Sequence, residues 1–440
     1  MLALLYGGEG MRYRSRDLPA LLRTHAGRSQ LCDGLLFGVS PATSRLAALY
    51  RRTSLRNVHV AAVVGSYGKT TTTRAITAAL GQTIHPNLAL NSPGRIPLSL
   101  FRLRSGDCHG VIEVGIDGRH QMSPMAKVIQ PDIVVVTTVG TDHNRSLESL
   151  EVTRDEKAHM VRALSPSGMA VLNGDDPNVT WMAGQTRARI ITFGFGESNH
   201  VRATDYRLDW PHGSRFRLHA AGEEREVSIR LLGRHMAYPV LAAVAVATAE
   251  GFSLDEVLTR LADLPPMPGR LFVKVLEDGI TLLCDDMKSS LETIHAALDV
   301  LAEIPAERRV VVLGPISEPV GSQAQHYHAL GPRIAAMARL GVFVGSFQKY
   351  RTRLTGAGMP AAALHDAGQD VSRAVEILRD LLRPGDVVLI KGRFGQRLAR
   401  IALALEGRPV RCNLSHCNAV SLYCRDCGML ERGWHNRVVF

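Results

Sequence analysis

The stretch from Val58 to Leu80 restricts the fold of this chain more than any other part of the sequence. It begins with the apolar run Val58–Val64, continues through a turn that holds two glycines, and ends in a segment with apolar residues at helical spacing. An unbroken apolar run of this kind is typical of a strand buried on both faces of a parallel sheet. Parallel strands need crossover connections that are usually helical, so the stretch predicts an α/β fold.

The turn has the chemistry of a phosphate-binding loop. Its sequence is Gly65-Ser66-Tyr67-Gly68-Lys69-Thr70-Thr71. Glycines allow backbone N–H groups to face phosphate oxygens, and the N-terminus of the following helix adds a positive dipole end. In such loops Lys69 would reach the β- and γ-phosphates and the Thr70 hydroxyl would bind Mg²⁺. A full GxxxxGK[ST] motif has a glycine where Val63 stands, and the alternative is a tight glycine turn with an exposed lysine.

The α/β pattern continues in two blocks, which the proline-rich segment 265–270 separates as a predicted hinge. In the first block we predict strands at 110–115, 133–138, 169–173 and 189–195, an antiparallel appendage at 200–231, and helices at 44–52, 149–164, 236–250 and 254–263. In the second we predict strands near 271–284, 309–313, 342–344 and 386–390, and helices at 289–303, 325–339, 371–382 and 395–406. The predicted domains are a short N-terminal region (1–54), a central domain with a mostly parallel sheet (55–266), a C-terminal Rossmann-like domain (267–408) and a cysteine-rich tail (409–440).

Composition narrows the classes of function. The chain has 440 residues, 45% of them hydrophobic, and no apolar run long enough to span a bilayer, so we expect a cytoplasmic globular protein without a membrane partner. Its formal charge of +11 suits anionic ligands such as nucleotide phosphates or a carboxylate. The basic residues are scattered and few aromatics lie between them, which disfavours nucleic-acid binding.

The loop and the motifs that follow it resemble the Mur ligase family, over residues 46–405. Within the family the pattern is most similar to the branch that adds the D-alanyl-D-alanine dipeptide. The resemblance implies a central P-loop ATPase domain, a C-terminal ligase domain, and ATP and Mg²⁺ as cofactors. It also implies an ADP-forming reaction in which ATP converts a carboxylate into an acyl phosphate that an amine or amino acid then attacks.

The resemblance assigns two Mg²⁺ ions to three residues: Glu113 in VIEVG, His143 in TTVGTDHNRS and Lys157 in RDEKAHM. Divalent ions screen the repulsion between the phosphoryl group and the carboxylate. A buried Glu113 would also need a cation partner. An ammonium repels Mg²⁺, and in the family this lysine is carbamylated. Taken singly, each residue has another interpretation. Glu113 could be an exposed carboxylate at the sheet edge, His143 a loop histidine and Lys157 a solvated helix lysine.

Further site residues follow from the same resemblance. Asn91, in the segment that follows the phosphate-loop helix, and Asn173, in LNGDDP, are candidate nucleotide-site residues. Arg270 in PMPGR would reach the γ-phosphate, Asp286 would hold the ribose, and Lys288 would face the phosphate or acyl phosphate. The segment Gly233–Pro239 departs from the family, because Met236 and Pro239 replace two asparagines that serve the base. Pro239 fits only in a first helical turn, so we predict a shifted helix start.

The substrates are less constrained than the chemistry. The 54 residues before the central domain are close to the lower size limit for the UDP-sugar domain of peptidoglycan ligases, so we expect a different small-molecule or peptide carboxylate. Pro315 and Arg393 depart from the family's motifs in the C-terminal domain, so the identity of the amine substrate stays open. Two other functions stay open: a nucleotide-binding subunit that has lost turnover, and a nucleic-acid-binding NTPase with a zinc module.

Four of the seven cysteines, Cys412, Cys417, Cys424 and Cys427, crowd into the C-terminal tail. Four thiolates suit tetrahedral structural Zn²⁺, and a cytoplasmic setting disfavours disulfides. His416 could replace Cys417 as a ligand, and reduced thiols in a loose tail are the alternative. Because the tail follows the family-like helices, we expect a docking element for a protein partner. The other cysteines, Cys32, Cys108 and Cys284, are expected to be buried thiols.

Overall fold

The computed structural model describes residues 6–7, 11–12, 22, 28, 40–84, 91–92, 94–141, 144–317, 321–417, 423–427 and 429–433. The chain divides into two compact units, one of residues 36–265 and one of residues 266–440 with residues 1–35. The division falls inside the proline-rich segment, between Pro265 and Pro266. Each unit is an α/β structure, as the sequence predicts. No helix in the described ranges is long and apolar enough to cross a membrane.

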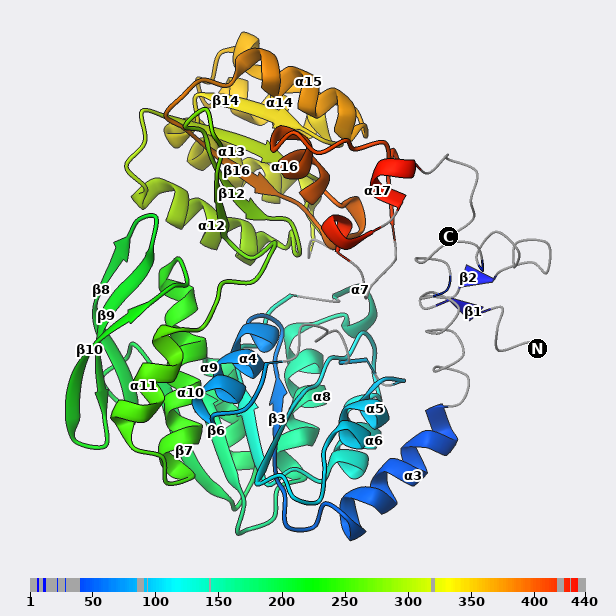
Figure 1. Cartoon of the computed structure of the whole chain (residues 1–440), viewed down its shortest axis with the longest axis vertical. Coiled ribbons are helices and arrows are strands. Elements are labelled where there is room, and N and C mark those ends of the chain that lie inside the picture. The colour runs from blue at the N-terminus through cyan, green and yellow to red at the C-terminus, as the bar shows by residue number, and fades with distance from the viewer. Residues whose placement is uncertain are drawn as a thin grey trace. The chain divides into compact units, whose positions relative to one another are not determined.

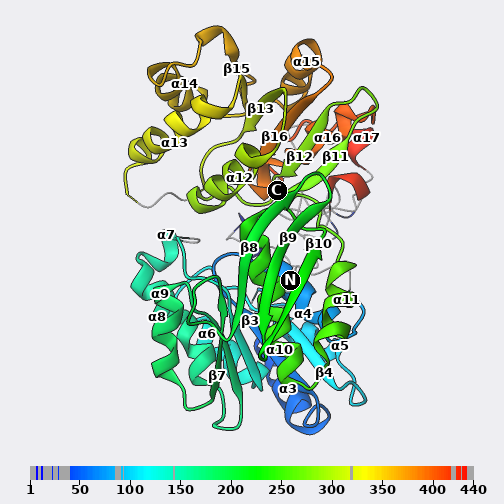
Figure 2. The same ribbon diagram turned by 90° about the vertical axis from the view of Figure 1, so that its left-hand side faces the viewer.

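The central unit is built on an eight-stranded sheet in the order β10-β9-β8-β7-β6-β5-β3-β4. Neighbours from β4 to β8 pair in parallel, while β8, β9 and β10 are antiparallel and extend beyond the helices (Figure 2). This confirms the predicted antiparallel appendage. The strands are β3 (His59–Val64), β4 (His109–Glu113), β5 (Ile133–Val136), β6 (Met169–Asn173), β7 (Arg189–Gly194), β8 (Val201–Asp209), β9 (Gly213–Ala220) and β10 (Glu223–Ile229).

Helices cover both faces of this sheet (Figure 1). On one face α4 (Lys69–Ala79), α10 (Ala237–Ala249) and α11 (Leu254–Ala262) pack together, and on the other lie α3 (Ser40–Thr53), α5 (Ile96–Arg102), α6 (Met122–Ile129) and α8 (Leu150–Arg162). The short α7 (Asn144–Leu147) and α9 (Pro177–Thr180) adjoin α8. Alternate residues of β3, namely Val60, Ala62 and Val64, enter the core beneath the second group. Burial on both faces therefore explains the apolar run Val60–Val64, while His59 at the start of the strand is exposed.

The C-terminal unit has a six-stranded sheet in the order β11-β12-β16-β13-β14-β15, parallel except for β11. Its strands are β11 (Phe272–Val275), β12 (Thr281–Asp285), β13 (Arg308–Leu313), β14 (Leu340–Phe343), β15 (Leu364–Asp366) and β16 (Asp386–Lys391). Its helices are α12 (Leu291–Glu303), α13 (Gln323–Met337), α14 (Phe347–Gly356), α15 (Val371–Leu381), α16 (Ala399–Leu405) and α17 (Met429–Arg432). The short edge strand β15 and helix α14 were not predicted. Two short strands, β1 (Tyr6–Gly7) and β2 (Met11–Arg12), pair near the N-terminus.

Helix α10 begins where its proline permits. A 3₁₀ turn at Arg234–Met236 precedes it, and Pro239 lies in the first turn of a helix that starts at Ala237. The missing N–H of proline costs nothing there, because the first-turn donors of a helix have no intrahelical partner. Pro239 therefore lies in the first helical turn, as the sequence predicts.

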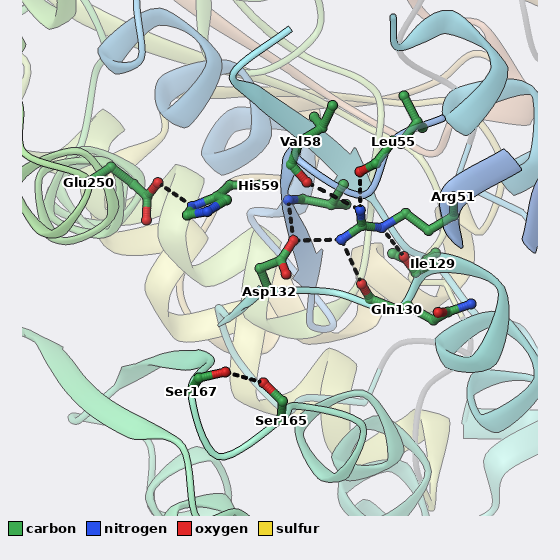
Figure 3. A network of polar contacts seen from close by, with 11 residues as sticks. Arg51, Leu55, Val58, His59, Ile129, Gln130, Asp132, Ser165, Ser167 and Glu250 are labelled. Atoms are coloured by element: carbon green, nitrogen blue, oxygen red, sulfur yellow. Dashed lines mark hydrogen bonds and ion pairs between the residues drawn. The ribbon is translucent and has the colours of Figure 1, made fainter. Parts of the chain in front are cut away.

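Helix α3 is fixed to the central unit by one buried arginine (Figure 3). The Arg51 guanidinium donates to the carbonyl oxygens of Leu55, Val58, Ile129 and Gln130 and to Asp132 Oδ2 at 2.6 Å. Asp132 Oδ2 also accepts from the backbone N–H of Val60 at 2.8 Å. This network joins α3 to the start of β3 and to the segment between α6 and β5. Residues 40–53, which the sequence assigns to the N-terminal region, therefore pack as part of the central unit.

Replacing Arg51 with methionine is expected to lower the free energy of unfolding by about 3 kcal/mol, because it strands buried carbonyl oxygens and removes one member of an ion pair. Urea unfolding of the whole chain measures the loss. The matched control is Arg52→Met on the next, exposed position, where the change should stay within about 0.5 kcal/mol. Equal stability of the two variants would contradict this role for Arg51.

Candidate active site

The phosphate loop connects β3 to α4 at the carboxyl edge of the central sheet. Two of its positions require glycine. Gly65 has a φ of 149°, and a Cβ there would meet Thr137 Oγ1 at 1.9 Å. Gly68 has a φ of 80° and forms the N-cap of α4. The strand, glycine turn and helix of the sequence prediction are confirmed.

Lys69 lies over this loop. Its Nζ donates to the carbonyl oxygen of Gly65 at 2.8 Å and to that of Ser66 at 3.2 Å. The ammonium is thus held beside the N-terminus of α4, where the helix dipole also favours an anion. Thr70 is half-buried and Thr71 is buried in the same first turn. Together these groups form a site suited to phosphate.

Lys157 is buried and points at the phosphate loop. Its side chain, on α8, is 3% exposed, and Nζ donates to Ser66 Oγ at 3.2 Å. Ser66 Oγ also accepts from the backbone N–H of Gly140 at 2.8 Å. The interpretation of Lys157 as a solvated helix lysine is therefore wrong. Lysine is rarely buried to this extent, which makes the position chemically unusual.

Glu113, at the carboxyl end of β4, is also buried and has one oxygen available. The residue is 6% exposed, and its Oε1 accepts from Asn91 Nδ2 at 2.7 Å. Its Oε2 is buried and has no hydrogen-bond partner among the described residues. An unpaired buried carboxylate oxygen fits a metal cation, so the residues present are compatible with Mg²⁺. The structure brings Asn91 and Glu113 together, while His143 lies outside the described residues.

Asn173 is buried at the carboxyl end of β6, and its side-chain amide bonds to the backbone. Its Nδ2 donates to the carbonyl oxygen of Thr137 at 2.8 Å, and its Oδ1 accepts from the N–H of Asp175 at 3.0 Å. Asp176 Oδ2 accepts from Val139 N at 2.8 Å in the same region. These bonds join the ends of β5 and β6 beside the phosphate loop. The amide of Asn173 is committed to the backbone, so it shapes the edge of the site.

The second unit has its own charged cluster, at the carboxyl ends of β12 and β16. Lys391 is 1% exposed and pairs with Asp285 Oδ2 at 2.8 Å, and its Nζ also donates to the carbonyl oxygen of Lys288. Burial lowers the pKa of Lys391, against the opposing effect of Asp285. Sequence reasoning missed this pair. Because Asp285 and Lys391 lie in register on neighbouring strands but far apart in the chain, only the sheet pairing reveals them.

The predicted ribose-binding Asp286 is buried in this cluster. It is 5% exposed, its Oδ2 accepts from Ala399 N at 2.9 Å, and burial raises its pKa. Arg270 has a buried Nε with no hydrogen-bond partner among the described residues. The structure therefore places Arg270, Asp286 and Lys288 in one unit with Lys391, and Asp286 fixes the start of α16.

The cysteine-rich tail packs on the C-terminal unit through Arg400. This arginine is 1% exposed and donates to the carbonyl oxygens of Cys412 at 2.7 Å and Leu414 at 2.6 Å. The N–H of Cys417 donates to the carbonyl oxygen of Gly395 at 2.8 Å. The described tail is thus attached to the helix that precedes it, and it is not a loose segment.

The described residues do not support the predicted four-cysteine zinc site. Cys412, Cys417, Cys424 and Cys427 are all described and carry free thiols, yet within the described ranges no three His, Cys, Asp or Glu residues are grouped to hold a metal ion. Cys412 Sγ lies 3.5 Å from Arg400 Nη1, and burial raises the pKa of Cys424 to about 12. Of the other cysteines, Cys284 is buried as expected, Cys108 is exposed against expectation, and Cys32 lies outside the described residues.

Both units of the chain match domains of known families. Residues 63–247 match the Mur ligase middle domain, and residues 269–394 match the glutamate ligase domain of Mur ligases. The UDP-N-acetylmuramoyl-tripeptide--D-alanyl-D-alanine ligase of Mycobacterium tuberculosis is 31% identical over 399 residues, which cover 85% of this chain and 78% of that enzyme. The Escherichia coli enzyme of the same name is 29% identical over 274 residues, or 61% of this chain and 60% of the enzyme.

Solved structures give the same result. The MurF structure from Acinetobacter baumannii superimposes with a TM-score of 0.74 at 25% identity and covers 84% of this chain and 81% of its own. The MurF ligase of Thermotoga maritima, solved in complex with ADP, has a TM-score of 0.71 at 21% identity and shares the fold. With both domains matched in order, this chain belongs to the Mur ligase family as a MurF-like, ATP-dependent and ADP-forming amide ligase.

Proposed function

We propose that the chain activates a carboxylate with ATP as an acyl phosphate and couples it to an amine. The phosphate loop and Lys69 would bind the phosphates, and Thr70, Glu113, His143 and a carbamylated Lys157 would hold Mg²⁺. Bound magnesium screens the charge of the two reacting anions. One carboxylate oxygen attacks the γ-phosphorus and ADP leaves. The amine then attacks the acyl carbon, and phosphate leaves with the transferred oxygen.

The observation that most supports this proposal is the burial of Lys157 against Ser66 of the phosphate loop. An ammonium at this position would repel a metal ion in the adjoining site. A carbamate on the same nitrogen would be an anion with two oxygens, close to a loop that binds the phosphates. Glu113 Oε2, buried and unpartnered, is the complementary acidic ligand.

The relatives supply a reference pair of substrates, one acid and one amine. The curated relatives are named for a UDP-N-acetylmuramoyl-tripeptide and D-alanyl-D-alanine. Pro315 and Arg393 replace family residues at the ends of β13 and β16, where the amine would bind, so we propose a different amine or acid as the preferred pair. Because ATP is the co-substrate, we place the reaction in the cytoplasm. We also propose that a protein partner binds the cysteine-rich tail.

A screen of acids and amines in pairs tests the function, with phosphate and ADP as readouts. The reference pair is included, and each acid and each amine is also assayed alone. ADP release that needs both members of a pair supports the ligase. ADP release without any pair dependence but stimulated by nucleic acid would favour an NTPase instead. Tight ADP binding with no turnover for any pair would favour a nucleotide-binding subunit.

A further inference from the structure

Beyond the phosphate loop, an aromatic and charged cluster lies at the carboxyl ends of β6 and β7. The Arg234 guanidinium carbon lies 3.7 Å from the centre of the Phe195 ring, and the Phe195 and Tyr238 rings meet edge to face at 5.3 Å. Phe195 and Tyr238 are half-buried, and Arg234 is exposed. We call Phe195, Arg234 and Tyr238 the ring platform. The phosphate chemistry described above does not use it.

Asp175 holds the ring platform in place. Its Oδ2 accepts from Phe195 N at 2.6 Å and from the Tyr238 hydroxyl at 2.9 Å. Its Oδ1 accepts from Gly196 N at 2.9 Å and from Asn199 Nδ2 at 2.8 Å. Burial and the charge of Asp175 raise the pKa of Tyr238 well above its usual range, so the hydroxyl keeps the proton that it donates. The platform is thus ordered before any ligand arrives.

The position of the platform suits the base of a nucleotide. The phosphate loop follows β3, and β5, β6 and β7 come next in the sheet. The ends of β6 and β7 are two to three strand spacings away, about 10–15 Å, on the edge where open α/β sheets bind ligands. Tyr238 lies in the first turn of α10, which packs along the phosphate-loop helix α4. A nucleotide with its phosphates in the loop has its sugar and base extended over that distance.

The two asparagines near the platform have their side-chain nitrogens bonded within the protein. Asn173 bonds to the backbone on both sides of its amide. Asn199 donates to Asp175, and its Oδ1 is enclosed beside Gly174, where a Cβ would lie 2.0 Å from it. Positions 236 and 239 carry a buried methionine and a buried proline. None of these four residues presents an amide to read the edge of a base.

We propose that this chain recognises its nucleotide by stacking the base on the ring platform, so that adenine and guanine nucleotides bind with similar affinity. Every base has a π-face, and stacking on an aromatic ring or a guanidinium plane tolerates different bases. Readout by paired hydrogen bonds would instead reject the wrong base strongly. This inference rests on nucleotide binding alone and not on the acid or amine of the proposed reaction.

Calorimetric titration of the whole chain tests it, with Mg²⁺ and three probes: ADP, GDP and inorganic tripolyphosphate. We expect the dissociation constants of ADP and GDP to differ by less than about tenfold. Phe195→Leu should weaken both nucleotides by about tenfold and Arg234→Ala by about fivefold, while tripolyphosphate binding stays unchanged. Two variants are measured so that a folding defect in one of them does not decide the test.

The control is Phe252→Leu at the other end of α10. Phe252 also lies near an arginine, with Arg260 at 5.2 Å from its ring, and it contacts His109 on the opposite edge of the sheet. This variant should bind all three probes as the unaltered chain does. A preference for ADP over GDP of tenfold or more, or unchanged nucleotide affinity in both platform variants, would overturn the proposal. Failure of every acid and amine pair to turn over would leave these binding results intact.

Discussion

Replacing Lys69 with alanine is expected to lower ADP release by about 10²-fold or more, as for loss of a preorganised charge on a transferred group. In the structure the Lys69 ammonium lies within 3.2 Å of the loop carbonyls, so it is already in place for the phosphates. Steady-state phosphate release with saturating ATP measures the loss. Because Lys69 is only half-buried, the variant should keep its fold.

The control for this variant is Lys127→Ala, on the exposed face of α6 in the same unit. It removes the same charge at a distance from the loop and should leave turnover within about twofold. Unfolding curves of both variants check that the fold is intact. Unchanged turnover in a folded Lys69→Ala chain would remove the phosphate loop from the mechanism.

Lys157→Ala is expected to abolish most of the activity, and a small added carboxylate should restore part of it. The reason is the predicted carbamate: a buried anion beside Ser66 is lost with the lysine, and a free acid of similar size can replace it. Turnover is measured with and without acetate or formate. Lys157→Arg should be inactive and beyond rescue, because it keeps a cation and fills the space.

Direct detection of the carbamate distinguishes a metal-binding role of Lys157 from a purely structural one. With ¹³C-labelled bicarbonate the unaltered chain should show a carbamate resonance that is absent from Lys157→Ala. Activity should also fall when dissolved carbon dioxide is removed and return when bicarbonate is added. A folded, active chain that shows neither the resonance nor the dependence would contradict a carbamylated Lys157.

The sequence predicted the parts of the structure that depend on local pattern. The run Val58–Val64, the glycines of the loop and the helix after it are confirmed, because burial on both faces and a left-handed turn each require particular residues. The proline in α10 likewise located the first turn of that helix. The resemblance identified Asn91 and Glu113, which the fold brings within hydrogen-bond distance.

Contacts between distant segments were beyond sequence reasoning. Asp285 and Lys391 meet only because β12 and β16 are neighbours, and Asp175 meets Tyr238 only because α10 begins at the ends of β6 and β7. The attachment of the cysteine-rich tail is a further contact of this kind. Cysteine spacing says nothing of Arg400, whose hydrogen bonds to the tail hold the backbone of Cys412 and Leu414.

The central claim, that ATP activates a carboxylate as an acyl phosphate, can be tested by following one oxygen atom. The acid of the best pair from the screen, or the reference tripeptide, is labelled with ¹⁸O in its carboxyl group and turned over once with ATP and the amine. Phosphate analysed by mass spectrometry should carry one ¹⁸O, because the carboxylate oxygen that attacks the γ-phosphorus leaves with it. Unlabelled phosphate, or label found in AMP, would contradict the account.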